Sequence, residues 1–288
     1  EVLASMMPYL GDLYGNPSSM HTFGGQVAEA VDTARERMAS LLHAEPDEII
    51  FTASGSEGDN TAIWSAVQSQ PEKRHIITTR VEHPAVINTC QFWERQGYHV
   101  KDLGVDEKGR LDLDEYEDAL TPDTAIVSIM FANNEVGNIY PIQKMAEMAK
   151  ERGILFHTDA VQAVGKIPID LRHLPADMLS LSGHKIHAPK GIGALYIRRG
   201  VRFRPLIRGG HQERGRRAGT ENVPYIVGLG KAAQLSEEFM QVERVNVALL
   251  RDKLERGILE NVPDTRVNGD IDNRLPNTTN FLSKMLRV

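Results

Sequence analysis

A lysine that could react with a carbonyl group follows a short apolar segment, in the sequence Ser182-Gly183-His184-Lys185. An amine held among small and polar residues at the end of a buried strand loses hydration, which lowers its pKa and allows it to form a Schiff base. The ordinary alternative is a lysine that extends its amine into water. Lys185 is therefore a candidate for covalent binding of an aldehyde.

A carboxylate, Asp159, follows a second apolar segment, in the sequence His157-Thr158-Asp159. Burial of a carboxylate is costly unless a cationic group lies beside it. His157 and Asp159 are also residue types that bind metals, but no third ligand lies at a suitable spacing, and we expect no metal site. Asp159 is instead a candidate partner for a cationic ligand.

A turn of small and polar residues, Gly55–Asn60 (GSEGDN), lies between an expected strand and an expected helix. Such a turn presents free backbone N–H groups and the positive end of the helix dipole to an anion, most often a phosphate. It is not a P-loop, because the Gly-Lys-Ser/Thr ending is absent. The alternative is an ordinary turn in which Ser56 or Asp59 caps the helix.

These three features are the ones that pyridoxal phosphate requires. The cofactor needs a lysine for its aldehyde, a carboxylate for its pyridinium nitrogen and a helix N-terminus for its phosphate. The carboxylate keeps the ring nitrogen protonated, which makes the ring an electron sink. Each feature is weak by itself, and their agreement on one ligand predicts a pyridoxal-phosphate site.

Strands and helices are expected to alternate along the chain, as in a parallel α/β sheet with right-handed crossovers. In such sheets, ligands bind at the carboxyl ends of the strands, where the three features lie. Apolar runs predict strands over 48–53, 75–79, 124–131, 154–156, 178–181 and 193–197. Helical periodicity predicts helices over 21–42, 57–67, 84–96 and 142–152, and two helices between 221 and 259.

The composition excludes several classes of protein. The 288 residues carry a formal net charge of −6, which argues against a general nucleic-acid or anionic-membrane binder. No apolar run approaches the roughly 18 residues of a membrane span, and the opening residues lack the basic start of a signal peptide. The chain has 1 cysteine, so a disulfide framework is excluded and a reducing compartment is expected.

Five long segments, in order along the chain, are similar to the cysteine desulfurases, and most of all to the NifS branch. They are VEHPAV (81–86), ANNEVG (132–137), HTDAVQ (157–162), SGHKIHAPKG (182–191) and RGGHQERGRRAGT (208–220). The resemblance runs from about Gly15 to Thr279. It implies the transferase fold of type I pyridoxal-phosphate enzymes, a mostly parallel sheet flanked by helices. The cofactor-binding large domain would span 1–238, and 239–288 would begin a truncated small α/β domain.

The resemblance also implies residue roles. Lys185 would bind the cofactor aldehyde and act as acid and base, and His83 would stack on the ring and assist proton transfer. Asp159 would pair with the ring nitrogen, while Asn134 and Gln162 would hydrogen-bond the ring oxygen and its surroundings. The phosphate would be anchored by Gly55, Ser56, Ser182, Gly183 and His184, and by Thr220 reaching across from the neighbouring subunit.

The implied activity removes sulfur from L-cysteine, giving L-alanine and an enzyme persulfide for iron–sulfur or nitrogenase metallocluster assembly. The implied partners are a second copy of the chain, with a shared active site, and an iron–sulfur scaffold protein that accepts the sulfur. The implied location is the cytoplasm. Two alternatives stay open: another enzyme of this fold, such as an aminotransferase or a selenocysteine lyase, and an inactive remnant that binds the cofactor or a partner subunit.

The nucleophilic cysteine of the family has no counterpart here. Cys90 lies on the apolar face of an expected helix, with Val86 and Trp93, and we expect it to be buried and structural. The family's nucleophile would follow Thr279, and a segment rich in Asn, Ala and Thr would precede Glu1. The chain as given is therefore expected to bind the cofactor without forming a persulfide.

Two further segments need an interpretation. Residues 198–217 hold eight arginines, which would suit nucleic acid, but the overall acidity favours a loop at a dimer interface beside a phosphate. After Asn280 the sequence leaves the family pattern. A one-base shift in the codons of 283–288 would restore Phe-Glu-Asn-Val-Glu-Gly, which leads to the hypothesis of a lost reading frame.

Overall fold

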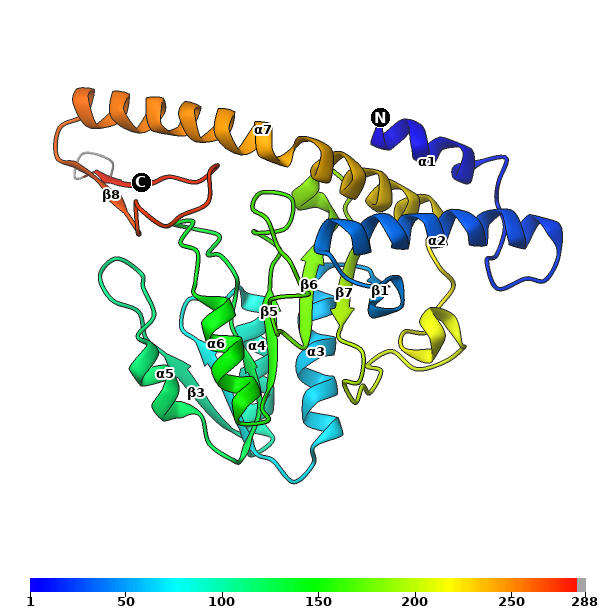
Figure 1. Cartoon of the computed structure of the whole chain (residues 1–288), viewed down its shortest axis with the longest axis horizontal. Helices are drawn as coiled ribbons and strands as arrows, with labels where there is room; N and C mark the ends of the chain where they lie inside the picture. The colour runs from blue at the N-terminus through cyan, green and yellow to red at the C-terminus, as the bar shows by residue number, and fades with distance from the viewer. Residues whose placement is uncertain (284–288) are drawn as a thin grey trace.

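A seven-stranded sheet forms the centre of the computed structural model, which describes residues 1–283 (Figure 1). The strand order is β1-β7-β6-β5-β4-β2-β3, and all neighbours are parallel except β7, which runs antiparallel to β1 and β6. The strands are β1 (Ile49–Thr52), β2 (His75–Thr79), β3 (His99–Leu103), β4 (Thr124–Ser128), β5 (Leu155–Asp159), β6 (Met178–Ser182) and β7 (Gly193–Ile197). The expected mostly parallel α/β sheet is confirmed.

Both faces of the sheet are buried, which explains why its strands read as continuous apolar runs. Successive residues alternate between the faces, so Ile76 packs against α3 (Gly55–Ser69) and α4 (Pro84–Arg95), while Ile77 packs on the opposite side. On that opposite side lie α2 (Thr22–Leu42) and α6 (Ile142–Glu151), whose apolar residues belong to the larger core cluster.

The remaining elements surround this core. The longest helix, α7, runs along α2 and continues beyond it (Figure 1). The remaining elements are α1 (Val2–Leu10), α5 (Leu113–Ala119), α7 (Val223–Asn261), the 3₁₀ helices η1 (Pro46–Glu48), η2 (Gly183–Ile186) and η3 (Gln212–Gly215), and an antiparallel pair of strands, β8 (Thr265–Asn268) and β9 (Asn280–Ser283). Among residues 1–283, no helix is long and apolar enough to cross a membrane.

The structure corrects three expectations. The segment 221–259 holds one helix of 39 residues, α7, and not two, because neither Pro nor Gly interrupts it between Lys231 and Arg256. Strand β4 ends at Ser128, short of the expected Phe131, whereas β5 continues to Asp159. Strand β3 has no counterpart among the expected strands, because its half-exposed edge position tolerates polar residues.

The proposed division of the chain at residue 238 stays a prediction. The buried residues of α7 all lie between Val223 and Ala233, whereas later apolar side chains such as Val242 and Leu250 are exposed. The packing of the helix therefore changes near the expected boundary. The reading-frame hypothesis depends on 284–288, which lie outside the described residues.

Candidate functional site

The predicted site residues converge on one cavity of ≈ 360 Å³ at the carboxyl ends of the strands. Because β5 and β6 are parallel neighbours, their last residues, Asp159 and Ser182, lie at the same edge of the sheet. The predicted residues that line the cavity are Gly55, Ser56, His83, Asn134, Asp159, Gln162, Ser182, His184 and Lys185. Gly183 and Thr220 are not among its lining residues.

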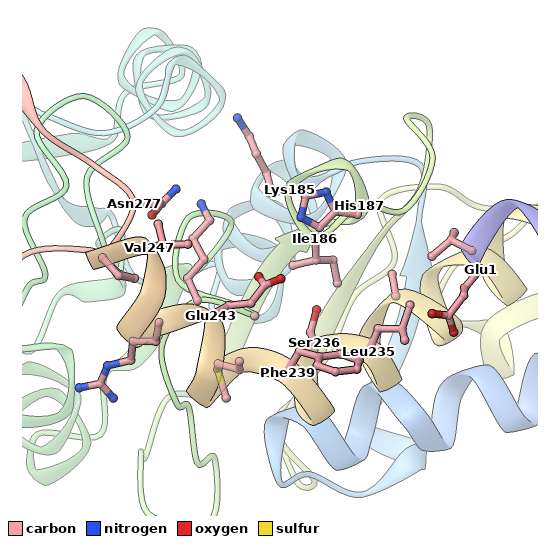
Figure 2. A pocket seen from close by; sticks show the side chains of 17 residues that line it. Glu1, Lys185, Ile186, His187, Leu235, Ser236, Phe239, Glu243, Val247 and Asn277 are labelled. Atoms are coloured by element: carbon pink, nitrogen blue, oxygen red, sulfur yellow. The ribbon is translucent and has the colours of Figure 1, made fainter. Parts of the chain in front are cut away.

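Lys185 lies in η2, directly after β6, and lines this cavity together with a neighbouring one of ≈ 530 Å³. Figure 2 shows the second cavity, where the Lys185 side chain extends away from α7 and its residues Ser236 and Glu243. No hydrogen bond or ion pair to its amine is found within residues 1–283. The amine is therefore available to a ligand from two sides.

Asp159 is 6% exposed, and its Oδ1 accepts a hydrogen bond of 2.9 Å from the Val161 N–H. Burial raises the pKa of Asp159, while that hydrogen bond and the charges of His83 and Lys185 oppose the rise. A cation placed against this carboxyl would also oppose the rise in its pKa. The site thus has the acceptor that a protonated ring nitrogen needs.

A second carboxyl, Asp59, lines the same cavity and is 1% exposed. Burial and the charge of Asp159 raise the pKa of Asp59 well above its ordinary value. The sequence offered Asp59 only as a helix cap, a role that Ser54 fills instead. Its position one turn after Gly55 on α3 is the signal that would have placed it at the site.

His157 is fully buried beside Asp59 and is a structural residue. Its Nδ1 lies 2.9 Å from Ser128 Oγ, and its Nε2 lies 2.9 Å from Ser180 Oγ and 3.7 Å from Asp59 Oδ1. Burial lowers the pKa of His157 to about 3, which keeps the ring neutral. No metal-binding group of three His, Cys, Asp or Glu side chains occurs in the described part of the chain.

The N-terminus of α3 provides backbone donors. Ser54 caps the helix by accepting the Glu57 N–H at 3.1 Å, which leaves the N–H groups of Gly55 and Ser56 without an intrahelical acceptor. A Cβ atom at position 55 would lie 2.7 Å from Val161 Cγ2, so only glycine fits between α3 and the cavity wall. This end of α3 can bind an anion closely.

Three polar side chains form the cavity rim. His83 caps α4 by accepting the Ala85 N–H on Nδ1 at 3.1 Å, and no residue among 1–283 hydrogen-bonds its other ring nitrogen, which can contact a ligand or solvent. Gln162 Oε1 accepts a hydrogen bond of 2.7 Å from Lys166, and Asn134 donates to Glu135 at 2.7 Å.

Lys166 was not singled out in the sequence, yet it fixes Gln162. Burial and the neighbouring charge of Lys185 lower the pKa of Lys166 to about 8. Two amines therefore lie near each other beside the site. The Gly165-Lys166 pair follows the HTDAVQ segment after two further residues, which was the available signal.

Ser182, the last residue of β6, and Gly183, which follows it, have different roles. Ser182 Oγ lies 2.9 Å from His184 Nδ1, so both side chains face the anion-binding end of the cavity as a pair. Gly183 instead donates its N–H to Ile192, and a Cβ there would lie 2.8 Å from Ile192 Cγ2. Gly183 allows close packing and does not itself line the cavity.

Comparison with known proteins identifies the family. The class-V aminotransferase family matches residues 1–287. The chain belongs to this family. It is 62% identical to a cysteine desulfurase of Nostoc sp. and 58% identical to the cysteine desulfurase NifS of Azotobacter vinelandii, in each case over 98% of this chain and 70% of the relative.

Solved structures agree. A NifS-like protein, 40% identical, superposes with a TM-score of 0.93 over 96% of this chain and 76% of its own. DndA from Streptomyces lividans, 37% identical, gives a TM-score of 0.86 over 96% of this chain and 78% of its own. The resemblance to NifS-type cysteine desulfurases and the fold of type I pyridoxal-phosphate enzymes are both confirmed.

Class-V aminotransferases depend on pyridoxal phosphate, and the residues of this chain fit that cofactor. The cavity combines an amine on Lys185, a buried carboxyl on Asp159 and the N-terminus of α3, whose Gly55 allows close approach. When bound, the cofactor supplies a pyridinium ring that withdraws electrons from its substrate.

Several side chains of the arginine-rich segment in this class-V family member form ion pairs within the chain. Arg217 pairs with Glu57 of α3 at 2.9 Å, and Arg199 pairs with Asp47 at 2.8 Å. Within the same segment, the buried Glu213 forms an ion pair of 2.7 Å with Arg35 of α2. These pairs fasten the loop to the fold beside the anion-binding end of α3, which disfavours the nucleic-acid alternative.

Cys90 is 2% exposed on α4, which confirms the expected burial. Burial, with the nearby charges of Glu82 and Asp102, raises the pKa of the Cys90 thiol to about 12. A thiol acts as a nucleophile in its thiolate form, which is scarce at this pKa. Cys90 is consequently a structural residue.

Proposed function

We propose that this class-V family member is a pyridoxal-phosphate-dependent cysteine desulfurase that converts L-cysteine to L-alanine and passes the sulfur on for iron–sulfur or nitrogenase cluster assembly. The observation that carries the proposal is that Lys185 and Asp159 line one cavity in a chain 62% identical to a cysteine desulfurase. The amine and the carboxyl are the two groups that pyridoxal chemistry cannot lack.

Each lining residue has a task in this proposal. Lys185 would hold the cofactor aldehyde and would serve as the acid and base that moves a proton between substrate carbon atoms. Asp159 holds the proton of the ring nitrogen, and His83 covers the ring face. Gln162 and Asn134 orient the ring through hydrogen bonds. The phosphate is bound by the N-terminus of α3, with Gly55 and Ser56, and by Ser182 and His184.

The sulfur-accepting step requires a thiolate that attacks the substrate sulfur, so that an S–S bond forms as the C–S bond breaks. Cys90 is unsuited to this step because its thiol is buried on α4 and its pKa is raised to about 12. We therefore expect the 288-residue chain to bind the cofactor and L-cysteine without forming a persulfide.

The partners follow from the same proposal. Thr220 is exposed and lies outside the cavity of its own chain, which suits a role at the phosphate of a second copy. The loop that carries it is held by the Arg217–Glu57 pair beside the N-terminus of α3. The proposed sulfur acceptor is an iron–sulfur scaffold protein, and the proposed location is the cytoplasm.

The test is an absorption titration of the purified chain with pyridoxal phosphate, followed by L-cysteine. The proposal expects a protein-bound Schiff-base band that is absent in Lys185→Ala and that changes on addition of L-cysteine. L-Alanine, which has the same amino and carboxylate groups but no C–S bond to break, provides the matched control. A wild-type chain that gives no such band would overturn the proposal, and a band that is lost on addition of other amino-group donors, as the cofactor becomes aminated, but not on addition of L-cysteine would favour an aminotransferase.

A further inference from the structure

We propose that Glu82 is a positioning residue that fixes His83 and Asn134 at the cofactor cavity by tying the segment after β2 to the segment after β4. The part of this inference that concerns the cofactor rests on the function proposed above. The tie itself does not, because it is made by groups of this chain alone.

The tie joins two adjacent parallel strands at their carboxyl ends. Glu82 Oε1 accepts a hydrogen bond of 2.9 Å from the Met130 N–H, just beyond β4, and one of 2.8 Å from Thr79 Oγ1, the last residue of β2. Glu82 is 5% exposed, so water does not compete for these bonds. One side-chain oxygen thereby fixes the ends of both strands relative to each other.

A second tie lies beside the first. Asn133 Nδ2 donates to the Val81 carbonyl at 3.2 Å, and Asn133 Oδ1 accepts the N–H groups of Glu135 and Val136, each at 2.9 Å. The two tying residues directly precede the two that line the cavity, His83 and Asn134. A backbone shift at either tie therefore moves a cavity residue.

Glu82 is suited to this position as a neutral acid. Burial raises its pKa to about 8, and its Oε2 has no hydrogen-bond partner within residues 1–283. The titratable groups that face it are Asp159 from β5, Asp59 from α3, Cys90 from α4 and Tyr140. An ionised Glu82 would add a charge near Asp159, whereas a protonated one accepts on Oε1 and adds none. An amide has the same shape and accepts in the same way.

The experiment compares Glu82→Gln, which keeps the accepting oxygen, with Glu82→Met, which has nearly the same volume and removes it. We expect Glu82→Met to weaken pyridoxal-phosphate binding about tenfold or more, because it leaves the buried Met130 N–H and Thr79 hydroxyl without their acceptor, and to shift the bound absorption band. Glu82→Gln should stay within about threefold of the wild type. Cofactor binding retained in Glu82→Gln would show that position 82 needs an accepting oxygen and not a charged group.

Glu48 provides a matched control elsewhere in the fold. It is also a buried glutamate, 9% exposed, and it accepts two backbone N–H groups, from Arg199 at 2.7 Å and Glu45 at 3.0 Å, but it does not line the cavity. Glu48→Met should lower the thermal unfolding temperature without shifting the cofactor band. Equal effects of both methionine variants on the band would overturn the positioning role.

Amide hydrogen exchange of the cofactor-free chain tests the tie independently of the proposed function. Glu82→Met should raise exchange in 81–86 and 130–136 together, and Glu48→Met should not. If Glu82→Met does not fold, Thr79→Val removes the hydroxyl that orients Glu82 and should give the same pattern more weakly. Unchanged exchange in both segments would refute the tie, even if the cofactor binds. A wild type that shows the tie but binds no cofactor would refute the positioning role as well as the proposed function.

Discussion

Asp159 ends strand β5, Lys185 follows the adjacent parallel strand β6, and the two side chains line the same cavity. The positive charge of Lys185 opposes the rise in the pKa of Asp159 that burial causes. The hydrogen bond from Val161 and the neighbouring cations therefore favour the ionised form of the carboxyl. A cofactor with a protonated ring nitrogen would supply one more.

Replacement of Lys185 tests the covalent part of the site. In Lys185→Ala, pyridoxal phosphate should bind reversibly, and the absorption band should resemble that of the free aldehyde, because no amine remains for the Schiff base. Lys166→Ala is the control, since Lys166 contacts Gln162 and not the predicted aldehyde position. A Schiff-base band that disappears in Lys166→Ala but persists in Lys185→Ala would show that the roles are reversed.

Asp159→Asn should weaken cofactor binding by about tenfold or more. An amide cannot pair with a protonated ring nitrogen as a carboxylate does, and a charge-assisted hydrogen bond contributes about 1.5–3 kcal/mol. Asp177→Asn is the matched control, because Asp177 accepts the Phe156 N–H at 2.8 Å near the start of β6, away from the cavity. Fluorescence titration measures both affinities. Equal losses would mean that Asp159 matters only for stability.

The free energy of unfolding should decrease as the pH rises from 5 to 8, because Glu82 is buried and resists ionisation in the folded state. Its pKa is about 8 in the folded chain and 4.5 in the absence of burial, so the folded state binds more protons in that interval and stability declines as pH rises. Glu82→Gln cannot ionise, and it should recover on the order of 3 kcal/mol relative to the wild type between pH 5 and pH 8. Urea unfolding at the two pH values measures this difference. Parallel pH profiles of the two proteins would argue against a neutral Glu82.

Cys90 should react with thiol reagents only when the protein unfolds. Cys90 is 2% exposed and the pKa of its thiol is raised to about 12, so in the folded state the reagent has little access and the thiolate is scarce. Labelling with Ellman's reagent should be slow in buffer and complete, at one thiol per chain, in guanidinium. Moving the thiol to the surface, by Ser18→Cys in a Cys90→Ala background, should restore rapid labelling. Fast modification of native Cys90 would contradict the structural assignment.

Glu213→Gln should destabilise the fold by about 3 kcal/mol, because it leaves the Arg35 guanidinium buried without its counter-charge. The pair is 2.7 Å long, and both side chains are almost fully buried. Arg199→Gln breaks the exposed Arg199–Asp47 pair of the same loop and should change stability by less than about 1 kcal/mol. Denaturant unfolding distinguishes the two, and similar small losses would show that water reaches Arg35.

The order of chemical groups along the chain was readable from the sequence. Apolar runs that end in Asp159 and Ser182, and a small-residue turn that starts at Gly55, predict strand ends and a helix start from local chemistry alone. The burial of Cys90 was readable for the same reason, since Val86 and Trp93 share its helix face. Local periodicity determines these features without knowledge of distant contacts.

The tertiary structure decided which polar groups lose their water, and that depends on segments far apart in sequence. Asp59 reads as a helix cap and Glu82 carries no signal of its own in the sequence, but the sheet buries both near Asp159, and burial raises the pKa of each. The unbroken α7 and the antiparallel β7 likewise followed from packing and pairing. A linear sequence specifies the types and spacing of side chains, whereas burial and charge proximity arise only when neighbouring strands bring their ends together.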